Sequence, residues 1–137
     1  MVMNAARNVP DEPAPAPPPA ILVVEDDVLV RTLVAGYLRE CGYDVVEAGS
    51  ADEAIRVLDA GMRTDIVFSD VNMPGSMDGF GLAQWLRRER PALKIILTSG
   101  ATRTAKEAAD LCEHGPILAK PYHHTELARR IRALLAQ

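Results

Sequence analysis

Five short, mostly apolar runs alternate along the chain with longer stretches in which apolar and charged residues recur at helical spacing. The runs cover residues 20–24, 43–48, 65–70, 94–97 and 117–119. Runs that are apolar throughout are typical of strands buried on both faces of a parallel sheet. Strands that alternate with amphipathic helices predict an α/β protein whose sheet is covered by helices on both faces.

Five helices are expected between and after these strands. The face of the first helix that is expected to be buried consists of Val30, Leu33, Val34, Tyr37 and Cys41, with Arg31 outside it. Residues 104–112 are expected to form a weaker fourth helix with an inner face of small side chains. Five strands and five helices in alternation favour a flavodoxin-like, doubly wound five-stranded parallel sheet with the strand order 2-1-3-4-5.

Composition excludes several classes of protein. A length of 137 residues suits one domain, and 48% hydrophobic and 25% charged residues are ordinary for a soluble protein with a core. A net charge of −4 argues against a dedicated nucleic-acid binder. No apolar run approaches the ~20 residues that span a bilayer, and the N-terminus has no signal-peptide pattern. We therefore expect a cytoplasmic protein whose two cysteines, Cys41 and Cys112, are reduced.

Residues 1–19 differ in composition from the rest of the chain. Their proline- and alanine-rich sequence favours polyproline II structure or disorder over helix or sheet. We expect a solvated tail here, with a proline-motif ligand for a partner as the alternative. Residues 20–137 are expected to form the folded domain.

Polar residues gather at the C-terminal ends of four of the expected strands. They are Glu25, Asp26, Asp70, Asn72, Thr98 and Lys120. In a sheet of order 2-1-3-4-5 these ends meet at one edge, around the topological switch point where ligands bind to open α/β sheets.

The chemistry of this group of side chains is informative. Three carboxylates within a few ångströms of one another would raise the pKa of at least one unless a cation were present. Oxygen ligands without cysteine or histidine favour Mg²⁺, or Mn²⁺, over zinc. The carboxylate of Asp70 can attack phosphorus to give an acyl phosphate. Lys120 supplies a positive charge and Thr98 a hydroxyl donor for the phosphate oxygens.

Four motifs carry a resemblance to a known family. They are the sequences ILVVEDD at 21–27, DVNMP at 70–74 with MDG at 77–79, TSG at 98–100, and KP at 120–121. With these motifs, residues 20–137 resemble the receiver domain of two-component response regulators, of the stand-alone, single-domain type. The resemblance implies that Asp70 accepts a phosphoryl group from a phosphohistidine on a histidine kinase or a histidine phosphotransfer protein.

The resemblance also implies a metal site. Asp26 and Asp70 would bind Mg²⁺ directly, together with the main-chain carbonyl of Asn72. Glu25 would act mainly through a metal-bound water.

Further roles follow from the same resemblance. Lys120 would pair with the phosphoryl group and precede a cis peptide bond to Pro121. Thr98 would be the switch hydroxyl. Phosphorylation would signal to a protein partner through the face formed by the fourth helix, fifth strand and fifth helix, with no direct contact to nucleic acid or membrane. Such a protein is no turnover enzyme, although it promotes its own Mg²⁺-dependent phosphorylation and dephosphorylation; it is expected to be a monomer or a phosphorylation-dependent dimer.

Three positions depart from the common receiver pattern. The loop after Asp70 has one extra residue, at Gly75-Ser76. Ile117 takes the switch position, three before the lysine, that is usually Tyr or Phe. Gly100 leaves a small side chain beside the phosphoryl site, which predicts easy access of water and a short-lived acyl phosphate.

Other functions fit the sequence less well. A haloacid-dehalogenase-like phosphatase would need a second acidic residue two positions after the nucleophile, where this chain has Asn72. Receivers that bind partners without phosphorylation usually lack an acidic residue or the lysine, and all are present here. Neither GxxxxGK[ST] nor GxGxxG occurs, so nucleotide binding has no support. His123 and His124 are expected to be solvated, and the arginines of 129–132 to form either a solvated face or a docking patch.

Overall fold

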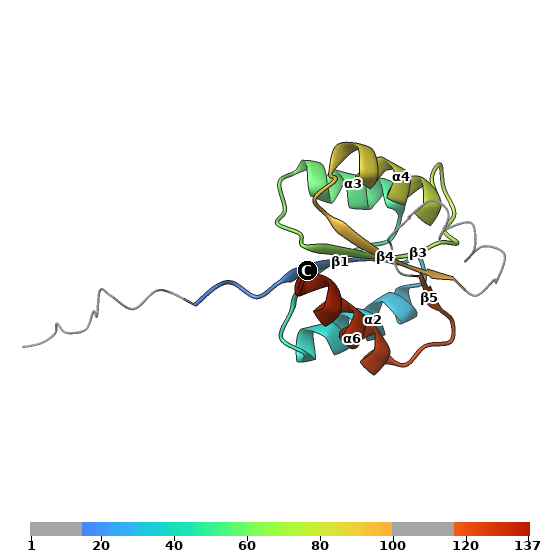
Figure 1. The fold of residues 1–137 in the computed structure, drawn as a ribbon. Helices are drawn as coiled ribbons and strands as arrows, with labels where there is room; N and C mark the ends of the chain where they lie inside the picture. Colours follow the sequence, from blue (N-terminus) through green and yellow to red (C-terminus); the bar gives the residue numbers. More distant parts are fainter. Residues whose placement is uncertain (1–14, 100–116) are drawn as a thin grey trace, which may run out of the picture.

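The computed structural model describes residues 15–99 and 117–137. Its five parallel strands lie in the order β2-β1-β3-β4-β5, as predicted (Figure 1). Their bounds are β1 Ala20–Val24, β2 Asp44–Ala48, β3 Ile66–Asp70, β4 Lys94–Ser99 and β5 Ile117–Ala119. Strands β1 and β3 are therefore adjacent at the centre of the sheet, which is where the predicted ligand crevice lies.

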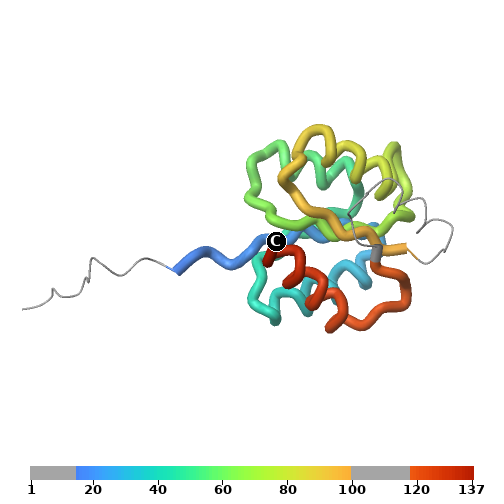
Figure 2. Tube along the Cα trace, in the orientation of Figure 1, coloured from blue at the N-terminus to red at the C-terminus, as the bar shows by residue number. Residues whose placement is uncertain are grey.

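Helices cover both faces of this sheet. Helices α3 (Ala51–Asp59) and α4 (Gly79–Glu89) lie on one face, and α2 (Val28–Glu40) and α6 (His124–Leu135) lie on the other (Figures 1 and 2). The fourth helix expected at 104–112 lies outside the described residues, as do Cys112, Gly100 and most of the tail. Among the described helices, none has the length and apolar character that a membrane crossing requires.

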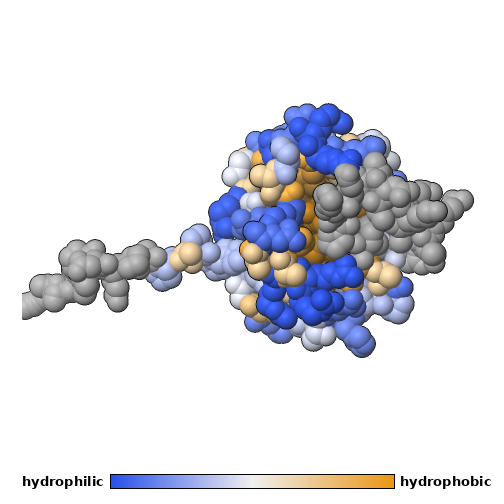
Figure 3. Space-filling model, in the orientation of Figure 1, coloured by the Kyte–Doolittle hydropathy of each residue, from blue (hydrophilic) through white to orange (hydrophobic). Residues whose placement is uncertain are grey.

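The sheet separates two hydrophobic cores. Alternate residues of each strand point to opposite faces, so Ile21 and Val23 join the core under α2 and α6, while Leu22 and Val24 join the core under α3 and α4. In the space-filling view, the hydrophobic residues that are visible lie mainly between the two hydrophilic helix layers (Figure 3). This arrangement holds the strand ends in a fixed register.

The starts of the helices are fixed by side-chain caps. The Asp27 carboxylate accepts hydrogen bonds from the amides of Leu29 and Val30 at the start of α2. Ser50 caps α3 and Asp78 caps α4 in the same way. Two of these three caps lie on the loops that follow β1 and β3, so they help to set the direction of the acidic strand ends.

Two expectations about α2 and α6 are wrong. The buried residues of α2 are Val34, Ala35 and Leu38, whereas Val30, Leu33 and Cys41 are exposed. The helix is therefore rotated from its expected orientation, with Ala35 buried and Leu33 exposed. On α6, His124 is half-buried rather than solvated, with its ring 4.9 Å from that of Tyr37.

Candidate phosphoacceptor and metal site

The predicted polar residues come together at the carboxyl ends of the central strands. Asp70 is the last residue of β3 and is paired in register with Thr98 on β4. Glu25 directly follows β1, and Lys120 directly follows β5. The parallel sheet thus places residues that are far apart in the sequence at one edge of the fold.

Glu25, Asp26 and Asp70 form an acidic cluster. Each offers a carboxylate oxygen, and these atoms lie within 4.8 Å of one another. Glu25 and Asp70 are only 7% and 6% exposed, while Asp26 is open to solvent. Burial raises the pKa of Glu25 to about 7, and the negative charge of Asp70 adds to this effect. The pKa of one carboxylate in the cluster is therefore raised, with burial as the largest cause and the charge of Asp70 as a smaller one.

Both oxygens of the Asp70 carboxylate have a protein partner. The Lys120 ammonium lies 3.1 Å from Oδ2, and the main-chain amide of Asn72 donates to Oδ1 at 3.2 Å. The Lys120–Pro121 peptide bond is cis, as the resemblance implied. These contacts hold the carboxylate in one orientation and place a positive charge beside it.

Thr98 provides a hydroxyl without a partner. Its residue is 2% exposed, and Oγ1 is a buried polar atom that has no hydrogen-bond partner among the described residues. Leaving a buried hydroxyl unpaired costs about 1–3 kcal/mol. A ligand oxygen at this strand end would satisfy it.

The donor set fits a divalent cation. All three clustered groups are carboxylates, and hard oxygen ligands of this kind suit Mg²⁺ or Mn²⁺. A cation there would offset the negative charge of Asp70, which contributes less than burial to the raised pKa of Glu25.

Two hydrogen bonds hold the loop from Asp70 to α4 in place. The amide of Gly79 donates to the carbonyl of Val71 at 2.9 Å, and Ser76 donates to Asp52 of α3 at 2.8 Å. Gly75 has a φ of +111°, which a residue with a side chain rarely adopts. The extra residue of the loop is thus accommodated by a glycine turn that is held against α3.

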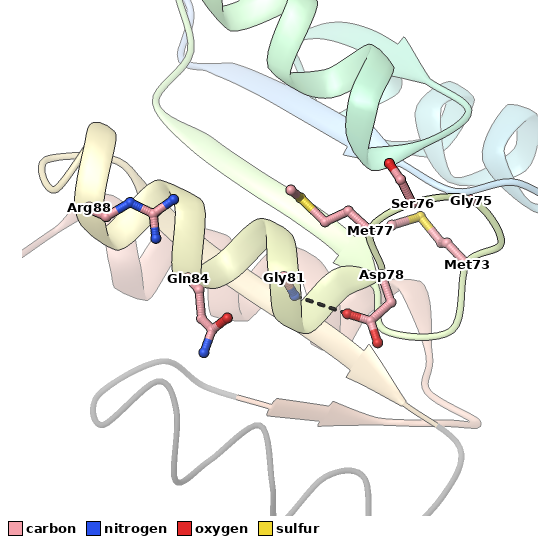
Figure 4. Close-up of a pocket in the computed structure, with 8 residues that line it drawn as sticks. All are labelled: Met73, Gly75, Ser76, Met77, Asp78, Gly81, Gln84 and Arg88. Carbon is pink, nitrogen blue, oxygen red and sulfur yellow. Dashed lines mark hydrogen bonds between the residues drawn. The ribbon is translucent and has the colours of Figure 1, made fainter.

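An open pocket of about 550 Å³ lies beside this loop and α4 (Figure 4). Met73, Ser76 and Met77 reach it from the loop, and Gln84 and Arg88 reach it from α4. The Asp78 carboxylate accepts a hydrogen bond from the amide of Gly81. None of the clustered carboxylates lines this pocket, so it is separate from the acidic site.

Sequence reasoning missed two residues near the acids. Burial, together with the negative charges of Glu25 and Asp70, raises the pKa of Tyr122 to about 12. Arg31, expected on the outer face of its helix, instead donates to the main-chain carbonyl of Glu25 at 2.9 Å. The position of Arg31, one turn after the acidic pair, was the only available signal for it. Ile117 begins β5 as expected, but its switch role stays a prediction.

Comparison with known proteins identifies the family. The family model for the response regulator receiver domain matches residues 21–132. The chain belongs to the receiver domain family. Receiver domains are signalling switches of two-component systems, and they bind Mg²⁺ at an acidic pocket. The acidic cluster of this receiver domain lies where such a pocket is expected.

Individual relatives agree with this assignment. The transcriptional regulatory protein AruR of Pseudomonas aeruginosa is 35% identical over 122 residues, which cover 85% of this chain and 49% of AruR. This chain spans about half the length of these curated relatives.

Solved structures give the same result. A response regulator receiver protein from Pseudomonas putida is 33% identical, with a TM-score of 0.77 over 86% of this chain and 98% of that one. The response regulator TrrA of Thermotoga maritima, solved in complex with Mg²⁺ and BeF, is 27% identical, with a TM-score of 0.76 over 85% of this chain and 98% of that one.

Proposed function

We propose that this receiver domain accepts a phosphoryl group on Asp70 from a phosphohistidine of a histidine kinase or histidine phosphotransfer protein. The observation that carries the proposal is the position of the Lys120 ammonium, 3.1 Å from a buried aspartate that clusters with two further carboxylates. A lysine and three acids from three separate segments, at the ends of β1, β3 and β5, meet at the end of β3, whereas a loop cap would need Asp70 alone.

The transfer is a displacement at phosphorus. An oxygen of Asp70 forms a bond to phosphorus while the bond from phosphorus to the donor imidazole nitrogen breaks, and the histidine leaves with the electron pair. Lys120 and the hydroxyl of Thr98 would hold two phosphoryl oxygens after transfer. Because little covalent chemistry is left to the protein, positioning and charge neutralisation supply most of the rate.

The metal site is assigned to Glu25, Asp26, Asp70 and the main-chain carbonyl of Asn72. Mg²⁺, or Mn²⁺, bound there would supply positive charge for the phosphoryl oxygens. Asp26 is exposed, which leaves an approach from solvent, while Glu25 and Asp70 are buried and fixed. Asn72 is a neutral amide, so no acid stands two residues after Asp70 to protonate a leaving group, as a turnover phosphatase would need.

An apolar rim beside Lys120 suits the phosphodonor protein. Val28, Leu29 and Leu33 of α2 are 57–68% exposed. A groove of about 580 Å³ runs from this part of α2 to Lys120 and Tyr122. Because the donor histidine must reach Asp70 while water is excluded, its protein must cover this rim, and apolar side chains favour such a contact.

The output is proposed to follow from a shift between two conformations. Movement of Thr98 toward the phosphoryl group would change the end of β4, next to β5. The surface built around β5 and α6 would then present a different face to a protein partner. Water attack on phosphorus would return Asp70 to its free state, so the domain acts on itself rather than turning over a substrate.

The decisive experiment compares the protein with Asp70→Asn after incubation with Mg²⁺ and a small phosphodonor. We expect intact-mass measurement to show one added phosphoryl group on the parent and none on the variant. Asp59→Asn, on the exposed end of α3, is the matched control and should be phosphorylated like the parent. Equal phosphorylation of Asp70→Asn, or none on the parent, would refute the proposal.

A further inference from the structure

Arg31 connects the acidic cluster to two other parts of the fold. It lies one turn into α2, and its Nη1 donates to the main-chain carbonyl of Glu25 at 2.9 Å. Its Nε donates to the Glu47 carboxylate on β2 at 3.3 Å. The side chain is only 20% exposed. A Cβ at position 49 would lie 3.1 Å from Nη1, so Gly49 leaves room for the guanidinium.

We propose that Arg31 is a positioning residue for the cation site, an inference that rests on the proposed function. The carbonyl that it binds belongs to the peptide group joining Glu25 to Asp26. The rotation of that peptide group sets the directions in which both side chains leave the backbone. A donor that fixes the carbonyl therefore fixes two of the three clustered carboxylates relative to Asp70.

The hydrogen bonds on either side of the Glu25–Asp26 peptide group do not fix its orientation. The amide of Glu25 is held by the carbonyl of Ala48 at 3.0 Å, as an extension of the sheet. The amide of Asp27 donates to the Glu25 carboxylate at 3.1 Å, and Asp27 caps α2. Among the hydrogen bonds of the described residues, the peptide group between these two anchors is bound by a side chain of α2, that of Arg31.

The geometry of the guanidinium suits this role. Its donors lie in a rigid plane, so one group can bind the Glu25 carbonyl and the Glu47 carboxylate together. Glu47 also pairs with Arg39, at 3.1 Å. A lysine has donors at a single point and could keep one of the two bonds at a time.

Arg39 provides a matched control. It lies on the same helix, binds the same Glu47, and donates to one main-chain carbonyl, that of Val45, at 3.0 Å. Val45 is the second residue of edge strand β2, toward the end of the strand opposite the clustered carboxylates. Replacing either arginine by methionine removes one positive charge and the same kinds of hydrogen bond.

The direction of the change in Mg²⁺ affinity distinguishes a loss of positioning from a loss of positive charge. Removing a positive charge near an acidic cluster favours cation binding, so electrostatics alone predicts tighter Mg²⁺ binding in both variants. Loss of positioning predicts weaker binding, and only for Arg31.

The test is calorimetric titration of Mg²⁺ into the full chain, with the free energy of unfolding of each protein measured separately in urea. For Arg31→Met we expect affinity to fall about tenfold, as for other outer partners of metal ligands. Arg39→Met should stay within about twofold of the parent, because exposed ion pairs contribute little. Arg31→Lys should fall between Arg31→Met and the parent, and it keeps the test valid if Arg31→Met does not fold.

Three outcomes would overturn the inference. Mg²⁺ affinity of Arg31→Met equal to or tighter than that of the parent would leave only the effect of charge. Equal weakening in Arg39→Met would show a general effect on the helix. Absence of Mg²⁺ binding in the parent would remove the metal part of the proposed function as well, whereas the first two outcomes leave that function intact.

Discussion

Replacing Gly79 by alanine tests how closely α4 is packed against the strand that carries the phosphoacceptor. Gly79 is the first residue of α4 and is buried. A Cβ at this position would lie 2.6 Å from the Cα of Val71 and would also contact the carbonyl oxygen of Asp70. Both neighbours are backbone atoms, so no side chain can rotate away to make room.

The size of the effect follows from this geometry. Carbon atoms in contact lie about 3.5–4.0 Å apart, so the helix start and the strand end must separate by about 1 Å. Overpacking of this kind costs about 1–3 kcal/mol, and the better helix propensity of alanine returns up to about 1 kcal/mol. We therefore expect the free energy of unfolding to fall by about 1–2 kcal/mol.

The effect on phosphorylation should exceed the effect on stability. A shift of Asp70 by about 1 Å is large beside its 3.1 Å contact with Lys120, and misplacement on this scale can slow a reaction about 100-fold. We expect a loss of that order in the rate of phosphorylation by a small phosphodonor with Mg²⁺, followed by intact mass. Urea denaturation gives the stability.

Gly36→Ala is the control for this substitution. Gly36 lies in the middle of α2, and a Cβ there would meet no atom within 4 Å. We expect the control to gain up to about 1 kcal/mol of stability and to be phosphorylated at the parent rate. Parent-like stability and rate in Gly79→Ala would refute the reasoning from packing.

Three further predictions concern charge and capping. In Mg²⁺-free buffer the free energy of unfolding should fall by about 1–2 kcal/mol as the pH rises from 4.5 to about 7, because the raised pKa of Glu25 makes the folded state hold a proton that the unfolded chain releases. Equilibrium urea denaturation across this pH range should show a smaller fall in the free energy of unfolding for Glu25→Gln than for the parent. Equal falls in the two proteins would contradict the assignment to Glu25. Lys120→Met removes a positive charge 3.1 Å from Asp70, so it should slow phosphorylation by about 100-fold. For the same reason Mg²⁺ affinity, measured by calorimetry, should be kept or increased. Weaker Mg²⁺ binding would show that the lysine is needed for the metal site. Asp27→Ala should cost about 1 kcal/mol in urea denaturation by removing the cap of α2, and an unchanged midpoint would show that the cap adds nothing.

Some residues of the site could be found from the sequence because each follows a recognisable strand. Asp70 ends a run of buried residues, and Lys120 lies between a short apolar strand and a proline. Parallel order then requires such ends to lie at one edge. The roles of these residues in metal binding and phosphoryl transfer remain predictions until they are tested in solution.

Arg31 could not be found in this way. Its spacing from the apolar residues of α2 places it on the outer side of an isolated helix, which is where it was expected. The contact with Glu25 depends on the rotation of α2 about its axis, which is seen in the burial of Ala35 and the exposure of Leu33. The half-buried position of His124 against Tyr37 follows from the same packing of α2 and α6.

The sequence by itself determined three features: the order of the strands, the helices on both faces of the sheet, and the position of the acids at one edge. Apolar periodicity and the rules for connecting parallel strands can be applied along the chain without knowledge of tertiary contacts. Tertiary structure alone decided the rotation of α2, the close approach of Gly79 to Asp70 and the reach of Arg31 to Glu25. These features depend on how side chains of different elements share space, and no pattern within one element contains that information.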